Sequence, residues 1–234
     1  MPDNVHLVGF ADDVAAVITA RNVTEAQLRL NQVMLRTMEW MDDRGLKLAT
    51  EKTELIILTK QQIPLEIEMR VWNSTIKTSK EMKYLGIQLD SRMSFWAQIK
   101  HAGEKASKAS ASLSKLMANV GGPTEDKRKL LMTVVNAILL YGSEVWSNAL
   151  QINQKRNALE KIQRTTALRV ASAYRTVSGA AVLVISSSIP IDLMAMERRQ
   201  AWLSRQSNEN SSVATNYREH TMIEWQSRWT NETS

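Results

Sequence analysis

Cysteine is absent from the 234 residues of this chain. Its absence excludes disulfide bonds and thiolate zinc sites within these residues. The three histidines, His6, His101 and His220, are far apart and show no metal-ligand spacing, so we interpret them as ordinary surface or core residues. No apolar run reaches the length that spans a membrane, and we predict no membrane contact. The N-terminal residues carry neither a basic region nor an apolar signal segment, so secretion is not expected.

Positive charge exceeds negative charge, with 30 Lys and Arg against 24 Asp and Glu and a formal net charge of +6. The hydrophobic fraction of 44% is typical of a globular protein, and the length allows one large domain or two small ones. A basic balance fits an anionic partner without identifying one, so the positions of the charges carry more information than their sum.

Two adjacent aspartates stand between two short apolar runs near the N-terminus. Residues 6–10 lead into Asp12 and Asp13, and residues 14–18 follow them. Both runs are apolar or β-branched, which predicts a hairpin with the two carboxylates at its tip. Neighbouring carboxylates between buried strands raise each other's energy. A solvated turn or a hard cation such as Mg²⁺ resolves that conflict, and the tetrapeptide by itself leaves both interpretations open.

The first 92 residues show the texture of an α+β domain. A capping box that begins at Thr24 predicts a helix that ends before Gly45. Strands are predicted at 55–58 and in two pieces over 65–72, and residues 82–90 alternate as a half-buried strand does. We therefore expect a long helix packed on a mostly antiparallel sheet.

From residue 93 the pattern is helical. Helices are predicted over 95–117, from Thr124 onward, over 153–174 and over 193–205, with apolar residues on one face of each. The lysines of the first of these helices lie off its apolar face: Lys100, Lys105, Lys108 and Lys115. We predict a helical bundle over 93–205 and a flexible, polar tail over 206–234.

Several motifs, taken in order, resemble a known family. Phe10-Ala11-Asp12-Asp13 resembles the catalytic aspartate pair of reverse transcriptases, in the form typical of non-LTR retrotransposons. Residues 45–54 are similar to the next palm motif, and residues 83–90 to the primer-grip hairpin. Residues 140–146, 174–178 and 189–191 resemble the thumb and post-thumb region of insect elements in the Jockey and ribosomal-DNA-inserting groups.

The resemblance implies a partial polymerase palm over 1–92, including the primer-grip hairpin, followed by an all-α thumb and post-thumb bundle over 93–205. It implies an RNA-directed DNA polymerase that uses two Mg²⁺ ions, an RNA template, a DNA primer and deoxynucleoside triphosphates. Asp12 would be the principal metal ligand and Asp13 a supporting one. Lys52 would stand near the pyrophosphate, although a surface lysine paired with Glu51 or Glu54 explains the same residue.

The resemblance also assigns nucleic-acid contacts. Tyr84, Leu85 and Gly86 would shape the primer grip, and the lysines named above, with the basic residues of the helix predicted over 153–174, would contact phosphates. The ordinary alternatives remain open: Tyr84 as an aromatic residue that packs on the core, and the lysines as a solvated helix face.

Members of the family carry a further palm aspartate and fingers ahead of the aspartate pair, and only nine residues precede Phe10. We therefore expect an internal piece of a longer polyprotein, with an incomplete two-metal site and no polymerase activity by itself. The alternative is a catalytically dead relic that at most binds nucleic acid through its basic thumb. The expected location is intracellular, in the nucleus for target-primed integration, although the sequence shows no targeting signal.

Overall fold

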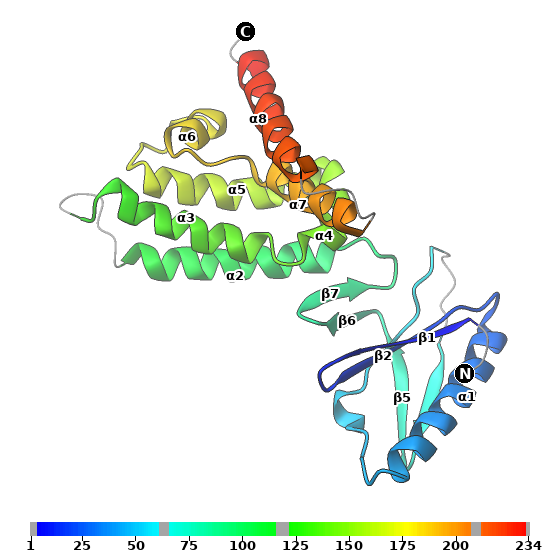
Figure 1. The fold of residues 1–234 in the computed structure, drawn as a ribbon. Coiled ribbons are helices and arrows are strands. Elements are labelled where there is room, and N and C mark those ends of the chain that lie inside the picture. Colours follow the sequence, from blue (N-terminus) through cyan, green and yellow to red (C-terminus); the bar gives the residue numbers. More distant parts are fainter. Residues whose placement is uncertain (1–3, 61–65, 116–121, 207–211, 233–234) are drawn as a thin grey trace. The chain divides into compact units, whose positions relative to one another are not determined.

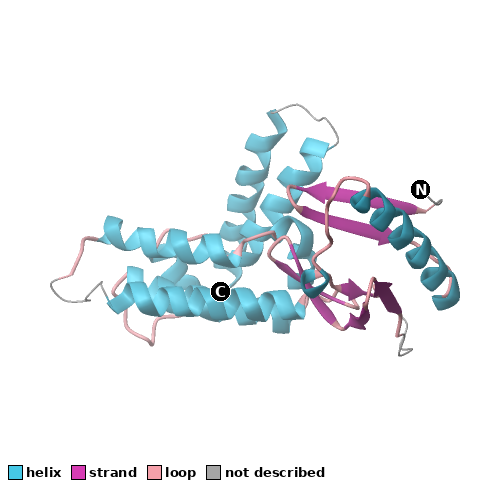
Figure 2. Cartoon of the chain, turned by 90° about the horizontal axis from the view of Figure 1, so that it is seen from below, coloured by secondary structure: helices cyan, strands magenta, loops and turns pink. Residues whose placement is uncertain are grey.

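The computed structural model describes residues 4–60, 66–115, 122–206 and 212–232. The chain divides into two compact units. The N-terminal unit comprises residues 1–83 and 90–93, and the helical unit comprises residues 84–89 and 94–234. Strands gather in the first and helices in the second (Figure 2), so the α+β class predicted from the sequence is confirmed in its mixed helix and strand content.

The N-terminal unit contains one long helix and several short strands (Figure 1). Its elements are β1 (Val5–Phe10), β2 (Asp13–Ile18), α1 (Val23–Asp42), the 3-10 turn η1 (Thr50–Lys52), β3 (Leu55–Ile56), β4 (Glu68–Val71), β5 (Ser74–Ser79) and most of β6 (Glu81–Tyr84). Strand β7 (Ile87–Asp90) belongs to the helical unit except for its last residue. The strands form three small sheets, ordered β1-β2, β3-β5-β4 and β6-β7. β3 runs parallel to β5, whereas β4 is antiparallel to it.

The strand predictions differ from the structure in several places. A single strand, β4, stands where two pieces were predicted over 65–72, of which residue 65 lies outside the described residues, and β3 is shorter than the strand predicted at 55–58. Strand β5, which is rich in serine and threonine, was not predicted. Residues 82–90 form a hairpin and not a single strand, because Leu85 and Gly86 both adopt positive φ, at 45° and 81°. A two-residue turn leaves the alternation of apolar and polar residues intact on both sides, so the period alone does not reveal it.

The N-cap of helix α1 lies two residues before Thr24, the N-cap of the predicted capping box. Its N-cap is Asn22, whose side chain accepts a hydrogen bond from the Glu25 backbone N–H at 2.8 Å. Glu25 in turn accepts from the Arg21 N–H at 2.8 Å, so the carboxylate still serves the start of the helix. Leu30, on the apolar face of α1, packs in a core with Met69 and Val71 of β4. Ile67, which directly precedes β4, completes this core.

A glutamine on α1 ties that helix to the edge of the sheet. The side-chain amide of Gln27 donates to the Glu68 carbonyl oxygen at 2.6 Å, and its oxygen accepts from the Glu68 N–H at 3.2 Å. Because β4 is an edge strand, these backbone groups have no ladder partner on that side. Gln27 supplies the missing pair.

The helical unit is built on three long helices that contact one another, α2, α3 and α5 (Figure 1). Its elements are α2 (Trp96–Lys115), α3 (Glu125–Leu139), α4 (Ser143–Trp146), the 3-10 turn η2 (Ser147–Gln151), α5 (Asn153–Val170), α6 (Gly179–Ile185), α7 (Ile191–Gln206) and α8 (Ser212–Glu232). Residues 116 and 117 of the helix predicted over 95–117 lie outside the described residues. The core is centred on Trp146, which is fully buried among residues of α2, α3, α5 and α7.

No single helix within the described ranges is both long and apolar enough to cross a membrane. One bent pair, Glu125–Leu139 with Ser143–Gln151, passes a test of length and composition, with a bend of 57° between its parts. The apolar residues Leu131, Val135 and Leu139 of this pair are buried in the core of the helical unit.

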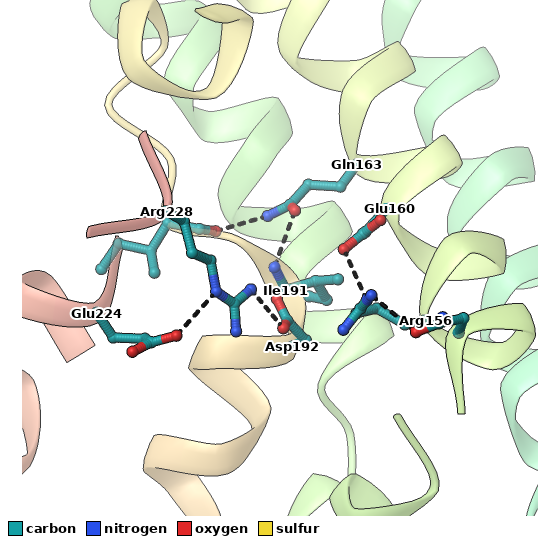
Figure 3. A network of polar contacts seen from close by, with 9 residues as sticks. Arg156, Glu160, Gln163, Ile191, Asp192, Glu224 and Arg228 are labelled. Carbon is teal, nitrogen blue, oxygen red and sulfur yellow. Dashed lines mark hydrogen bonds and ion pairs between the residues drawn. The ribbon is translucent and has the colours of Figure 1, made fainter. Parts of the chain in front are cut away.

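A buried glutamine connects α5 to the start of α7 (Figure 3). The amide of Gln163 donates to the Ile189 carbonyl oxygen at 2.8 Å, and its oxygen accepts from the Ile191 N–H at 2.9 Å. Gln163 is fully buried and the two backbone groups flank Pro190. The side chain therefore pairs two groups of a segment that has left one helix and not yet entered the next.

The tail prediction for residues 206–234 requires correction, because Ser212–Glu232 forms helix α8 and packs on α7. Arg228 of α8 donates to the Asp192 carboxylate at 2.7 Å and to Glu224 at 3.1 Å (Figure 3). Burial acts to lower the pKa of Arg228, but the hydrogen bonds and charges of Asp192 and Glu224 together outweigh it and raise that pKa. The polar composition concealed these specific contacts, and with them the buried Thr221.

Candidate functional site

The two adjacent aspartates occupy the tip of the β1–β2 hairpin, as the sequence pattern predicted. Phe10 pairs with Asp13, which leaves Ala11 and Asp12 as a two-residue turn. Ala11 has a φ of 52°, a left-handed conformation that is uncommon for a residue other than glycine. The turn brings Asp12 and Asp13 to one end of the hairpin, where both are exposed.

The strands that carry this tip are not buried, which corrects the expectation of carboxylates between buried strands. Phe10 is 63% exposed and Val14 66% exposed, and Leu7, Val8 and Val17 are also largely open to solvent. Among the described residues, the contacts that anchor the hairpin lie at its far end: Ile18 packs on the core of the N-terminal unit, and Arg29 of α1 hydrogen-bonds to the Thr19 carbonyl oxygen. Solvation therefore relieves the repulsion between the carboxylates.

The donor set at the tip is compatible with a hard cation, although it is small. Mg²⁺ is usually held by one or two carboxylates, with water and substrate phosphates as the remaining ligands. Asp12 and Asp13 supply two such carboxylates. Among the described residues, no group of three or more His, Cys, Asp or Glu side chains comes close enough to hold a metal ion, so a closed protein cage is not formed there.

Lys52 lies in η1 and is exposed. Within the described part of the chain, its ammonium makes no hydrogen bond or ion pair with Asp12, Asp13, Glu51 or Glu54. Glu54 has a different role: its carboxylate accepts from the Lys83 backbone N–H at 3.2 Å and so links this segment to β6. In the described part of the chain, the Lys52 side chain therefore makes no direct polar contact with the two aspartates.

Tyr84 ends β6, and Leu85 and Gly86 form the turn that leads to β7; all three residues belong to the helical unit. Leu85 is exposed, whereas the Tyr84 hydroxyl is buried and has no hydrogen-bond partner among the described residues. The Tyr141 hydroxyl donates to the Leu85 carbonyl oxygen at 3.0 Å. Tyr141 was not predicted as a site residue, because only the tertiary structure brings residues 85 and 141 together.

The four predicted lysines of α2 lie on its outer face. Lys100, Lys105, Lys108 and Lys115 are all exposed, and at 3.6 residues per turn they span roughly 140° of the helix circumference. The buried residues Ile99, Ala102 and Ala106 lie on the opposite side. Glu104 stands among the lysines and reduces the net positive charge of the face. The Lys100 ammonium lies 5.3 Å from the centroid of the Trp96 ring.

The cations of α5 are largely used inside the helical unit. The Lys155 ammonium donates to the Ser94 carbonyl oxygen at 2.6 Å, and Arg164 donates to the carbonyl oxygens of Arg175 and Val177, each at 2.7 Å. Arg169 reaches the Ser114 carbonyl oxygen at 3.4 Å. These three side chains bind backbone carbonyl groups in the structure, and the contact of this helix with phosphates stays a prediction.

Comparison with known proteins identifies the class to which the chain is related, the RNA-directed DNA polymerases of retrotransposons. More particularly, the chain is a homologue of Pol polyproteins of type-1 retrotransposable elements of the R1 group, and the resemblance to non-LTR reverse transcriptases is confirmed. No family model matches the sequence, and no solved structure matches the fold.

The relatives cover the chain to different extents. The "Retrovirus-related Pol polyprotein from type-1 retrotransposable element R1" of Nasonia vitripennis is 27% identical over 98% of this chain and 74% of its own length. A second Nasonia vitripennis Pol polyprotein of this type is 25% identical over 86% of the chain and 50% of its own length. The "Probable RNA-directed DNA polymerase from transposon BS" of Drosophila melanogaster is 27% identical over 66% of the chain, which spans only 17% of that relative.

Proposed function

We propose that this chain is the C-terminal palm and thumb portion of a non-LTR retrotransposon reverse transcriptase, which copies RNA into DNA by nucleotidyl transfer. The observation that carries the proposal is the exposed Asp12-Asp13 turn at the tip of a hairpin, in a chain whose homologues are Pol polyproteins. The N-terminal unit would be the end of the palm, and the helical unit would be the thumb and post-thumb region. The parent polyprotein would supply the remaining parts of the polymerase.

At the hairpin tip, Asp12 and Asp13 would hold Mg²⁺ in the parent enzyme. When bound, the metal would activate the primer hydroxyl and neutralise charge on the incoming deoxynucleoside triphosphate. The two aspartates are solvated and acceptor-only when ionised, so they are free to coordinate. Lys52, as an exposed ammonium without an ion-pair partner in the described part of the chain, would stabilise phosphate charge.

The helical unit would bind the duplex of RNA template and DNA primer. Its α2 lysines are exposed and lie on one side of the helix, which suits contacts to a phosphate backbone. Such contacts release counterions, so the affinity should fall steeply as salt rises. Catalysis in the nucleus, on target-primed DNA, is the setting that this function implies.

Salt-titrated binding of the 234-residue chain to a fluorescent RNA–DNA primer–template tests this proposal. Replacing Lys105 and Lys108 with glutamine should reduce the slope of log affinity against log salt by about 0.7–0.9 for each phosphate that the variant no longer neutralises. Lys127→Gln is the matched control, because Lys127 is exposed on α3, outside the α2 face. No binding of the wild-type chain at low salt, or an equal reduction of the slope in the control, would contradict the proposal.

The aspartate assignment is tested in the intact parent enzyme. Asp12→Asn should abolish primer extension, because the amide is a far poorer ligand for Mg²⁺ than a carboxylate. The free energy of unfolding should change by less than about 0.5 kcal/mol, since Asp12 is exposed and its side chain makes no hydrogen bond or ion pair with the described residues. Retention of more than a small fraction of primer extension would show that Asp12 is not the principal ligand.

The second candidate function is a catalytically dead relic that binds nucleic acid only. The exposed β1–β2 hairpin favours this candidate, because the described residues leave several of the hairpin's apolar side chains open to solvent. Both candidates predict salt-sensitive binding by the isolated chain. The sequence of the transcript upstream of Met1 distinguishes the two candidates. An open reading frame that continues into fingers and another palm aspartate supports the enzyme, whereas a stop codon supports the relic.

A further inference from the structure

The turn at Leu85 and Gly86 adopts a backbone conformation that needs support. Leu85 has a φ of 45°, in the left-handed region where a residue with a Cβ is strained, and Gly86 has a φ of 81°. Leu85 is 38% exposed, so its side chain is only partly packed. The support comes from a segment 56 residues later in the sequence.

Tyr141 covers this turn with its ring and hydroxyl. The hydroxyl donates to the Leu85 carbonyl oxygen at 3.0 Å. A Cβ added to Gly86 would lie 3.0 Å from the Tyr141 Cε1 atom and 3.1 Å from its hydroxyl oxygen. Glycine at position 86 therefore serves two purposes, because it accepts the positive φ and lets the aromatic ring approach the backbone.

A second glycine makes the reciprocal contact. Gly142 has a φ of 63°, and a Cβ at this position would lie 2.5 Å from the Cδ1 atom of Ile87. The two segments thus interlock: the ring of Tyr141 packs on Gly86, and the side chain of Ile87 packs on Gly142. Neither contact leaves space for a methyl group without a shift of the neighbour.

Tyr141 is itself held by buried and charged groups. The indole N–H of the fully buried Trp146 donates to the Tyr141 carbonyl oxygen at 3.0 Å. Arg198 of α7 donates to the preceding carbonyl oxygen, that of Leu140, at 3.1 Å. On the other side of the turn, the buried Gln98 accepts from the Gln88 N–H at 2.9 Å. The turn is therefore tied to α2 and to the α3–α4 junction at once.

We infer that Tyr141 is a positioning residue, which fixes the Tyr84–Gly86 turn so that its backbone meets the 3′ end of the primer strand. The contact with the primer rests on the proposed function, whereas the geometry of the turn rests on the contacts that Tyr141 makes. Tyr141 does not touch the reacting atoms. Its hydroxyl holds the Leu85 carbonyl and thereby the direction of the turn, while the α2 lysines carry most of the affinity for the duplex.

A primer with 4-thiothymidine at its 3′ terminus, annealed to RNA and irradiated on the 234-residue chain, measures this positioning. Tyr141→Phe should lower the crosslink yield to the peptide that contains residues 84–89 by up to about five-fold, the effect expected for one neutral hydrogen bond. The dissociation constant for the duplex should change by less than about two-fold, because phosphate contacts dominate it. Amide exchange at residues 85–88 should accelerate without a matching fall in the thermal midpoint.

Tyr174→Phe is the matched control, since Tyr174 lies in the same unit and is 85% exposed. It should leave crosslinking and exchange unchanged. Unchanged crosslinking in Tyr141→Phe overturns the inference while the proposed function stands. Parallel losses of affinity, crosslinking and thermal stability also overturn it, because they indicate a purely structural role. If the wild-type chain binds no duplex, the proposed function fails and the positioning role fails with it.

Discussion

Replacing Gln163 with methionine removes the connection between α5 and the start of α7 while nearly conserving side-chain size. Gln163 is fully buried, and both ends of its amide bind backbone groups, the Ile189 carbonyl oxygen at 2.8 Å and the Ile191 N–H at 2.9 Å. Methionine has no donor and only a poor acceptor, so both backbone groups are left without their partner. Water has little access, because Ile191 is also fully buried.

The expected destabilisation follows from those two groups. A buried backbone donor or acceptor left without a partner costs about 1–3 kcal/mol, and burial of an apolar side chain in place of an amide returns part of that. We expect the free energy of unfolding to fall by about 2–4 kcal/mol. For a protein of this size, that corresponds to a drop of roughly 4–16 °C in the thermal midpoint.

Circular dichroism at 222 nm suits the measurement, because most helical residues belong to the helical unit. Gln154→Met is the control, since Gln154 lies on the same helix, is exposed and makes no hydrogen bond within the described residues. It should change the free energy of unfolding by less than about 0.5 kcal/mol. Equal effects of the two substitutions, or a change below about 1 kcal/mol in Gln163→Met, would refute the reasoning.

Two further predictions concern charged pairs. Arg228→Gln leaves the nearly buried Asp192 without its cation and should destabilise α8 by about 1–2 kcal/mol, after allowance for the 35% exposure of Arg228. The amide protons of α8 should exchange faster in this variant than in the control Arg218→Gln, because the Arg218 pair is more exposed. The hydrogen bond and charge of Lys77 lower the pKa of Glu68 below its ordinary 4.5. The pair therefore contributes fully above that value and is lost as pH falls through the lower folded pKa; Lys77→Gln should return the NMR titration midpoint of Glu68 towards 4.5, and a native midpoint at or above 4.5 would contradict this.

The sequence predicted the hairpin at Asp12 and Asp13 because its signal is local: two apolar β-branched runs on either side of polar residues. The long helices were predicted for the same reason, as their apolar periodicity extends over four or five turns. The N-cap is Asn22 and not the predicted Thr24; both residue types are good N-caps, and local pattern does not choose between two positions so close together. The order of the motifs along the chain indicated the relation to retrotransposon polymerases, which the homologues confirm.

Glutamine and tyrosine contacts were decided by the tertiary structure alone. Gln27, Gln98 and Gln163 look like ordinary polar residues in helices, yet each binds backbone groups of a segment outside its own helix. The pairing of Tyr141 with Leu85 likewise spans 56 residues. The sequence by itself determined the long helices of the core and the hairpin tip, since these depend on neighbouring residues, whereas long-range pairing depends on which backbone groups the fold leaves without a partner.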